Sequence, residues 1–201
     1  MEEQLSNNSL KFRDRKEKLM RFLTSLFDFL KTFLLALVIV LPIRYFLFQP
    51  FMVRGESMFP NFRNGDYLIV DEISYRFSQP QRGDVIVFKY PKDKSQRFIK
   101  RIVGLPGETV EIKDGRVKII NKDNQEIFLS EIYLPQGVQT VGDVIVRLGP
   151  GEYFVLGDNR NYSYDSRVWG ALPQENIIGK VFLRVFSLPS WPFSAQLFIS
   201  K

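Results

Sequence analysis

The segment "ETVEIKDGRVKII", residues 108–120, decides the class of fold. Two runs rich in β-branched residues flank an Asp-Gly pair, which is the strongest short-range signal for a β-hairpin. Similar short runs follow one another after residue 50, separated by Gly and Pro: "DYLIVDEI", "GDVIVFKY", "RFIKRIVG", "DVIVRLG", "EYFVLG" and "NIIGKVFLRVF". This pattern of short strand-like runs predicts a mainly β domain, either an antiparallel sheet or a partly closed barrel. Residues 113–147 are the weakest-patterned part, and we expect them to form an excursion of hairpins.

Composition excludes several kinds of site. The chain has 201 residues, which favours one compact domain with a short appendage. It contains no cysteine and no histidine, so disulfides, thiolate chemistry and a Cys/His metal site are ruled out. No metal and no cofactor is expected.

The N-terminal part combines basic residues with an apolar run. Seven Lys or Arg precede residue 32, and "TFLLALVIVLPI" follows at residues 32–43. With its flanks this run reaches the roughly 20 residues that a membrane-spanning helix needs. Bulky residues follow it, without the small-residue cleavage site of a signal peptide. A buried helix of a soluble protein is the remaining alternative.

We predict one N-terminal transmembrane helix, because the apolar run with its flanks is long enough to cross a membrane and has no cleavage site after it. Residues 1–25 should form a basic cytoplasmic segment, residues 26–48 the anchor, and residues 49–201 an extracytoplasmic β-rich domain. The orientation follows from the excess of positive charge before the span. The basic residues before an apolar span favour membrane lipid rather than nucleic acid as the partner of this segment. The apolar end, "SLPSWPFSAQLFISK", contains two prolines and is too short for a second span, so an interfacial or packed tail is expected.

A serine and a lysine form the candidate catalytic pair. Ser57 lies in "VRGESMFPNF", residues 53–62, and a chain without histidine cannot build a Ser-His-Asp triad around it. Lys100 lies in "FIKRIVG", a predicted strand whose two faces are both half apolar, so either Lys100 or Arg101 should approach the core. A desolvated lysine loses its proton readily and an arginine does not. Lys100 is therefore the candidate base for Ser57, with a snorkelling surface lysine as the alternative.

Five segments carry a resemblance to a known family. They occur in the order "IRYFLFQPF", "SMFP", "NGDYLIV", "KRIVGLPGE" and "GDNRNYSYDSRVWG". In this order and spacing the chain resembles the bacterial type I signal peptidases, membrane-anchored proteases with a serine–lysine dyad. The resemblance spans residues 44–180. It implies that Ser57 is the nucleophile, that Lys100 is the general base, and that the backbone N–H of Ser57 serves the oxyanion hole.

The resemblance also assigns supporting roles. Ser163 matches the serine that hydrogen-bonds and orients the lysine. Asp165 and Arg167 match a salt bridge that braces the site, and Asp158 and Asn159 belong to the supporting turn.

Three positions depart from the family pattern. Gly55 replaces a serine that gives many relatives a second oxyanion donor, so that donor is unassigned here. Glu56 stands where small residues are common, and Asn61 stands where a threonine often follows the proline.

The resemblance implies a membrane-bound serine endopeptidase that cleaves N-terminal signal peptides from exported preproteins through an acyl-enzyme. The enzyme is expected to be a monomer in the cell (plasma or inner) membrane, single-pass, with its catalytic domain outside. Two alternatives stay open. One is a specialised maturation protease with the same dyad, and the other is a non-catalytic membrane-anchored β domain that binds peptides.

Overall fold

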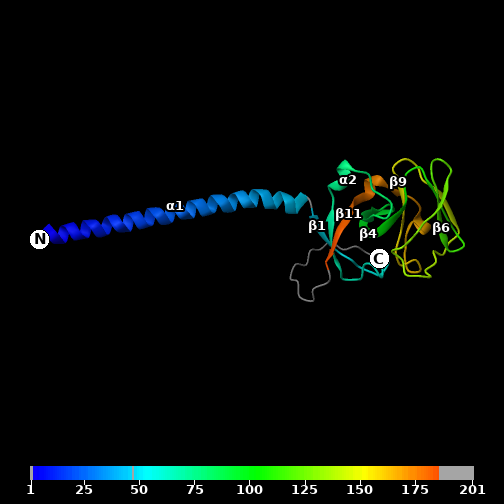
Figure 1. The fold of residues 1–201 in the computed structure, drawn as a ribbon, viewed down its shortest axis with the longest axis horizontal. Coiled ribbons are helices and arrows are strands. Elements are labelled where there is room, and N and C mark those ends of the chain that lie inside the picture. The colour runs from blue at the N-terminus through cyan, green and yellow to red at the C-terminus, as the bar shows by residue number, and fades with distance from the viewer. Residues whose placement is uncertain (1, 47, 186–201) are drawn as a thin grey trace. The chain divides into compact units, whose positions relative to one another are not determined.

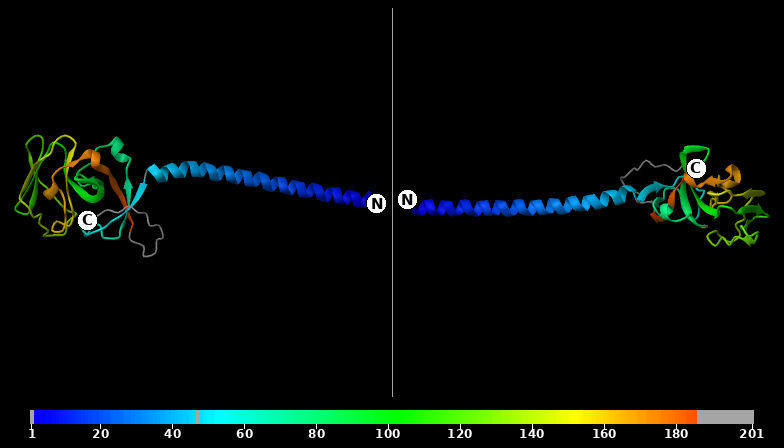
Figure 2. Two further views of the ribbon diagram at one scale, coloured as in Figure 1. Left: turned by 180° about the vertical axis from the view of Figure 1, so that it is seen from behind. Right: turned by 90° about the horizontal axis from the view of Figure 1, so that it is seen from above.

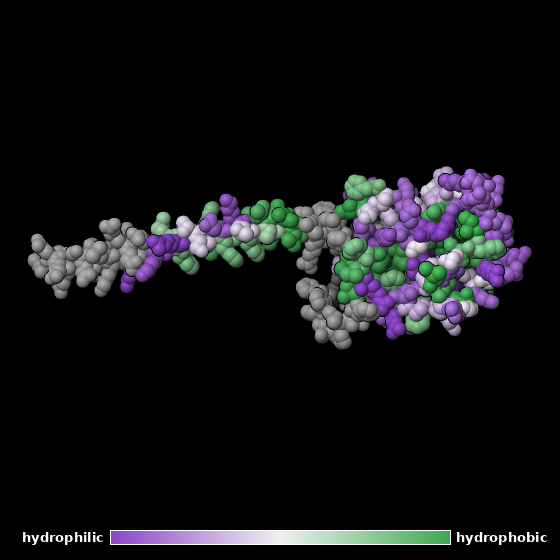
Figure 3. All heavy atoms as spheres, viewed as in Figure 1, coloured by the Kyte–Doolittle hydropathy of each residue, from purple (hydrophilic) through white to green (hydrophobic). Residues whose placement is uncertain are grey.

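The computed structural model describes residues 2–46 and 48–185. The chain divides into two compact units, Met1–Tyr45 and Phe46–Lys201. The described part of the first unit belongs to helix α1, Glu2–Phe46, drawn in blue in Figure 1. Among the described residues one stretch, Met20–Val40, is long and apolar enough to cross a membrane. Its side chains are exposed, and in Figure 3 the hydrophobic residues gather toward the later part of the described helix. The apolar tail predicted at residues 187–201 lies outside the described residues.

The second unit is built mainly of antiparallel strands, as the sequence predicts (Figures 1 and 2). A seven-stranded sheet has the order β1-β2-β11-β3-β4-β9-β10. Its strands are β1 (Phe48–Met52), β2 (Tyr67–Asp71), β3 (Val85–Tyr90), β4 (Asp93–Gly104), β9 (Glu152–Leu156), β10 (Leu172–Pro173) and β11 (Ile177–Val185). Between the described strands no pairing joins β1 to β10, so this sheet is not a closed barrel.

A second sheet has four strands in the order β7-β6-β5-β8. These are β5 (Thr109–Lys113), β6 (Arg116–Ile120), β7 (Glu126–Phe128) and β8 (Val144–Arg147). The chain leaves the larger sheet after β4 and returns to it at β9, so this sheet is an excursion that begins a few residues before the predicted 113–147. Asp114 and Gly115 both have positive φ, 50° and 73°, and connect β5 to β6 through the predicted hairpin.

Short helices complete the unit: α2 (Ser74–Phe77), α3 (Ser166–Trp169) and the 3-10 turn η1 (Gln174–Asn176). Apolar side chains of the two sheets form three buried clusters, and every member of them lies at or after Phe51. Full burial of one such side chain contributes about 1.5–3 kcal/mol to folding. Among the residues whose side chains the structure describes, the buried core of this unit therefore contains none from α1.

Candidate active site

Strand β4 places Lys100 inside the larger sheet. Lys100 pairs with Ile86 of β3, and its neighbours on the same face, Phe98 and Ile102, belong to a buried cluster. Only 1% of Lys100 is exposed, so the alternative of a surface lysine is excluded. Its Nζ makes a 2.7 Å hydrogen bond with Ser57 Oγ and donates to the carbonyl of Ile99 at 2.9 Å. The structure therefore brings the two candidate catalytic atoms into direct contact.

Burial sets the protonation state of this amine. Desolvation lowers the pKa of Lys100 from 10.5 to about 8, while the carboxylates of Asp165 and Asp158 oppose the shift. A large fraction of the amine is neutral near this pH and can accept a proton. This is the electrostatic condition that a lysine general base requires.

The loop between β1 and β2 carries Ser57 and is held at both ends. Val53 N–H donates to the carbonyl of Asp66, and Gly55 N–H donates to Asn64 Oδ1 at 3.0 Å. Gly55 has φ +88°, a conformation that favours glycine over the serine of many relatives. Met58 is buried beside the nucleophile and anchors the loop in the core. Among the described residues the N–H of Ser57 has no backbone acceptor, so it is available to a substrate oxyanion.

The polar turn after β9 packs directly against this loop. Asn159 N–H donates to the carbonyl of Ser57 at 3.0 Å, and Asn159 Nδ2 donates to the carbonyl of Glu56 at 3.1 Å. Asp158 is buried and accepts two hydrogen bonds from Arg101, from Nε at 2.8 Å and from Nη2 at 2.6 Å. Asp158 and Asn159 thus connect the nucleophile loop to the strand that carries the lysine.

Asp165 and Arg167 form a bidentate ion pair in which Arg167 Nε and Nη2 lie 2.8 and 2.9 Å from the two carboxylate oxygens. Asp165 is completely buried and also accepts from Gly157 N–H at 3.1 Å. Ser163 lies beside Gly157, but its buried Oγ has no hydrogen-bond partner within the described residues. The bond from Ser163 to Lys100 is not formed here, and the orienting role of Ser163 stays a prediction.

A groove of about 790 Å³ opens at the nucleophile. It is lined by residues of the Ser57 loop, of β3 and β4 and of the polar turn: Gly55, Glu56, Ser57, Tyr90, Gln96, Phe98, Tyr162 and Tyr164. The Tyr90 and Tyr164 hydroxyls share a hydrogen bond of 2.9 Å, and the Tyr90 ring stacks on Phe98 with centroids 4.9 Å apart. This aromatic wall can hold apolar side chains of a peptide next to Ser57.

Sequence reasoning missed this wall, and it also missed a buried network behind the turn. The Arg160 side chain is fully buried, and its guanidinium binds Glu131 and Thr140. Tyr133, on the same loop as Glu131, stacks over Arg101 with the guanidinium 4.1 Å from its ring centroid. Its carbonyl accepts from Asn61 Nδ2 at 2.9 Å, and Asn61 Nδ2 also reaches Asp158. The composition of the turn could have pointed to Arg160, but residue spacing cannot pair it with a loop 20 to 30 residues earlier.

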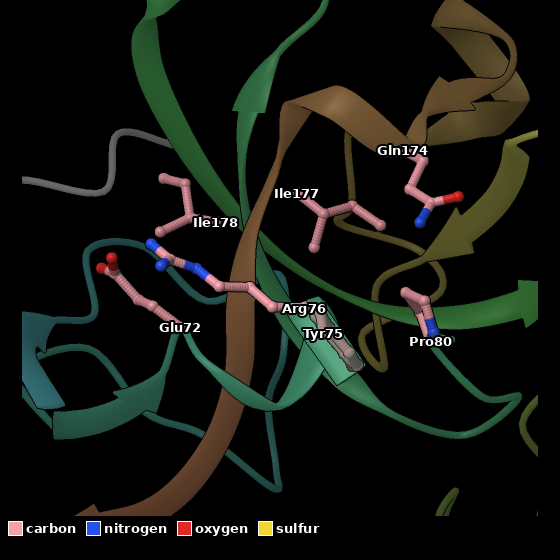
Figure 4. A pocket seen from close by; sticks show the side chains of 7 residues that line it. All are labelled: Glu72, Tyr75, Arg76, Pro80, Gln174, Ile177 and Ile178. Carbon is pink, nitrogen blue, oxygen red and sulfur yellow. The ribbon is translucent and has the colours of Figure 1, made fainter. Parts of the chain in front are cut away.

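A smaller depression of about 270 Å³ lies between α2 and β11 (Figure 4). Its lining contains neither Ser57 nor Lys100. Figure 4 shows Arg76 extending toward Glu72 and Ile178, with Pro80 and Gln174 at the other end. Burial raises the pKa of the Glu72 carboxyl. Nothing in this depression resembles a nucleophile with its base.

The part of the chain that the structure describes contains no group of three or more carboxylates that could hold a metal ion. The chemistry available at Ser57 is that of a hydroxyl beside a partly neutral amine, with a free backbone N–H nearby. This set of groups can perform acyl transfer.

Comparisons with known proteins find similar sequences over most of the chain. The family model described as signal peptidase, peptidase S26, matches residues 26–186. A probable signal peptidase I-1 of Synechocystis sp. is 43% identical over 165 residues, covering 79% of this chain and 81% of that protein. Signal peptidase I of Leptolyngbya laminosa is 39% identical over 174 residues, covering 83% and 80%. Signal peptidase I V of Bacillus subtilis is 36% identical over 154 residues, covering 73% and 90%.

Proposed function

This chain belongs to the S26 family of signal peptidases and is a serine endopeptidase, and we propose that it cleaves signal peptides with Ser57 as nucleophile and Lys100 as general base. The observation that carries the proposal is the 2.7 Å contact between Lys100 Nζ and Ser57 Oγ in a site where the amine is desolvated. A base within hydrogen-bond reach of the proton that it abstracts is the first requirement of such a mechanism.

The first half of the reaction forms an ester. Ser57 Oγ bonds to the scissile carbonyl carbon while its proton passes to Lys100. The N–H of Ser57 donates to the developing oxyanion. The C–N bond then breaks, and the protonated Lys100 gives its proton to the leaving amine, which becomes the new N-terminus of the mature protein.

The second half releases the enzyme. A water molecule gives a proton to Lys100 as its oxygen attacks the ester carbonyl. The tetrahedral intermediate then collapses, and the proton on Lys100 returns to Ser57 Oγ. The signal peptide departs as a carboxylic acid, and the dyad is restored.

Supporting residues hold the dyad in place. Asn159 fixes the nucleophile loop, Asp158 joins that loop to Arg101, and the Asp165–Arg167 pair braces the turn. Ser163 is assigned to the orientation of Lys100 when substrate is bound. The Gly55 N–H is engaged by Asn64, so it is not the second oxyanion donor unless that bond opens.

The substrate lies extended in the groove beside Ser57. Strand-like side-chain alternation directs two residues of the preprotein into the aromatic wall and the residue between them away from it. Small side chains at these two positions match the A-x-A-like ends of export signals.

The apolar helix fits a membrane-anchored enzyme. We propose that the N-terminus lies in the cytoplasm and the β domain outside, with anionic lipid against the basic segment, because basic residues precede the span. Tethering raises the effective concentration of a preprotein whose own apolar segment lies in the same bilayer. We propose a monomer as the working unit, because one chain contains both members of the proposed dyad.

The test uses the full chain in detergent with one preprotein and reads the new N-terminus by sequencing. Cleavage after an A-x-A-like sequence is the expected result. Ser57→Ala must abolish cleavage, because it removes the proposed nucleophile, whereas a β domain that only binds peptides would keep its function after this change. Unchanged cleavage by Ser57→Ala would refute the assignment.

A further inference from the structure

Among the eight residues that line the groove beside the proposed dyad, one carries a formal charge. Seven of its lining residues are aromatic, small or neutral, and the eighth is Glu56. This carboxylate directly precedes the nucleophile in the chain. The sequence as a whole is basic, with a net charge of +6, so a lone negative charge at this place is not a consequence of composition.

The backbone of Glu56 is fixed while its side chain is not. Its carbonyl accepts hydrogen bonds from Asn159 Nδ2 at 3.1 Å and from Phe59 N–H at 3.0 Å. The residue is exposed, and within the described part of the chain its carboxylate has no hydrogen-bond or ion-pair partner. A side chain with these properties contributes little to the fold and is free to meet a substrate.

Glu56 is also separate from the protonation of the base. The carboxylates that act on Lys100 are Asp165 and Asp158, both of which already have arginine partners. The charge of Glu56 is therefore directed to the groove rather than to the dyad.

We propose that Glu56 determines specificity, so that preproteins with a cationic side chain within two residues of the scissile bond are cleaved in preference to those with an acidic one. This inference rests on the proposed function. Two substrate positions are concerned: the residue between the two small ones, which strand alternation turns out of the wall, and the first residue after the cut, which lies next to Ser57.

The expected size of this substrate preference follows from the strength of exposed ion pairs. One exposed pair changes an equilibrium about two- to fivefold, and repulsion of a like charge acts in the opposite sense by a similar factor. A lysine substrate should therefore exceed a glutamate substrate in kcat/KM by about tenfold at low ionic strength, and the ratio should fall as salt screens the pair.

The experiment measures kcat/KM of the full chain in detergent on two sets of A-x-A peptides. One set carries Lys, Gln or Glu between the alanines, and the other carries them directly after the cut. Glu56→Gln should bring the Lys-to-Glu ratio close to one, and Glu56→Lys should invert it. Asp123→Asn, which removes an exposed carboxylate on the turn after β6, is the matched control and should leave the ratio as in the wild type.

Each outcome is decisive. A wild-type ratio that exceeds one in at least one set, and that Glu56→Gln abolishes, supports the proposal. A ratio near one in both sets, or a ratio that survives Glu56→Gln, overturns it. An equal loss on all three peptides also overturns it, because Glu56 would then support catalysis instead of selecting charge. Failure of the wild-type enzyme to cut the Gln peptides is a different result, and it contradicts the proposed function itself.

Discussion

Lys100 Nζ lies 2.7 Å from Ser57 Oγ, although the two residues are 43 positions apart in the chain. Lysine comes from the middle of a central strand and serine from a loop near the edge of the same sheet. Residues 157–160 connect the serine loop to the lysine strand. Asn159 donates a hydrogen bond to the carbonyl of Ser57, and Asp158 binds Arg101, the residue next to the lysine. The contact between the two residues of the proposed dyad is thus a product of the sheet topology.

The pH dependence of kcat/KM should report the lysine. Lys100 acts as a base only when neutral, and burial lowers its pKa to about 8. Activity should therefore be low at pH 6, rise through a midpoint near pH 8 and level off above it. The measurement is kcat/KM on one neutral peptide between pH 6 and 10. A flat profile, or one that falls as the pH rises, would contradict Lys100 as the base.

Substitution of the lysine should be as damaging as loss of the serine. Lys100→Ala and Ser57→Ala should each lose about 10³-fold or more in kcat/KM, and the double variant should lose little more, because the two residues act as a unit. Lys100→Arg should be equally inactive, since arginine keeps its proton. An active Lys100→Arg enzyme would contradict Lys100 as the general base for Ser57.

Arg101 is the matched control for Lys100. Arg101→Ala should keep activity within about tenfold of the wild type, because no proton of the reaction passes through this residue. It leaves the buried Asp158 without its arginine, so the thermal midpoint should fall. Both quantities can be read on the same preparations. A loss of activity as large as that of Lys100→Ala would show that the arginine has a direct part in catalysis.

The local pattern predicted the class of fold and singled out Ser57 and Lys100 as candidate partners, while their catalytic roles come from the family resemblance. The turn at Asp114 and Gly115 and the run of alternating strands follow from local rules. The burial of Lys100 follows from a strand with two half-apolar faces, and its pairing with Ser57 follows from the absence of histidine.

Long-range partners could not be predicted in the same way. The order of strands places β11 between β2 and β3, a pairing that no local signal specifies. The burial of Arg160 depends on Glu131 and Thr140 from the connection between β7 and β8, and the aromatic wall depends on Tyr90 and Tyr164, which are 74 residues apart. Such contacts depend on the tertiary packing of distant segments, which hydrophobic periodicity and secondary-structure propensity do not specify.

Removal of residues 1–45 should leave a folded β domain. Among the described side chains, the members of each buried cluster lie at or after Phe51, and the deletion keeps strand β1, which pairs with β2 along five residues. Peptide cleavage should persist, whereas processing of a preprotein in vesicles should fall much further because the shared tether is lost. Circular dichroism checks folding, and the two substrates are compared with the full chain. Equal losses on both substrates would show that the helix is part of the catalytic fold.

Gly157 should tolerate no side chain. A Cβ at this position would lie 2.1 Å from Ser163 Oγ and 2.4 Å from the carbonyl oxygen of Ser57, and the second of these is backbone that cannot step aside. Gly157→Ala must therefore displace the nucleophile loop, at a cost of about 1–3 kcal/mol in stability. A displacement of the order of 1 Å at the reacting atoms costs about 10²-fold in rate.

We expect Gly157→Ala to remain folded while its kcat falls by about 10²-fold or more. Gly149→Ala is the control, because its added Cβ would meet only the flexible carboxylate of Glu152 at 3.1 Å. The kcat and the thermal midpoint, measured for both variants, separate displacement of the nucleophile from loss of stability. If both variants lost activity in proportion to stability, the loss would reflect unfolding rather than displacement of Ser57. A fully active Gly157→Ala enzyme would mean that the nucleophile loop is more compliant than its contacts with Asn159 and Gly157 imply.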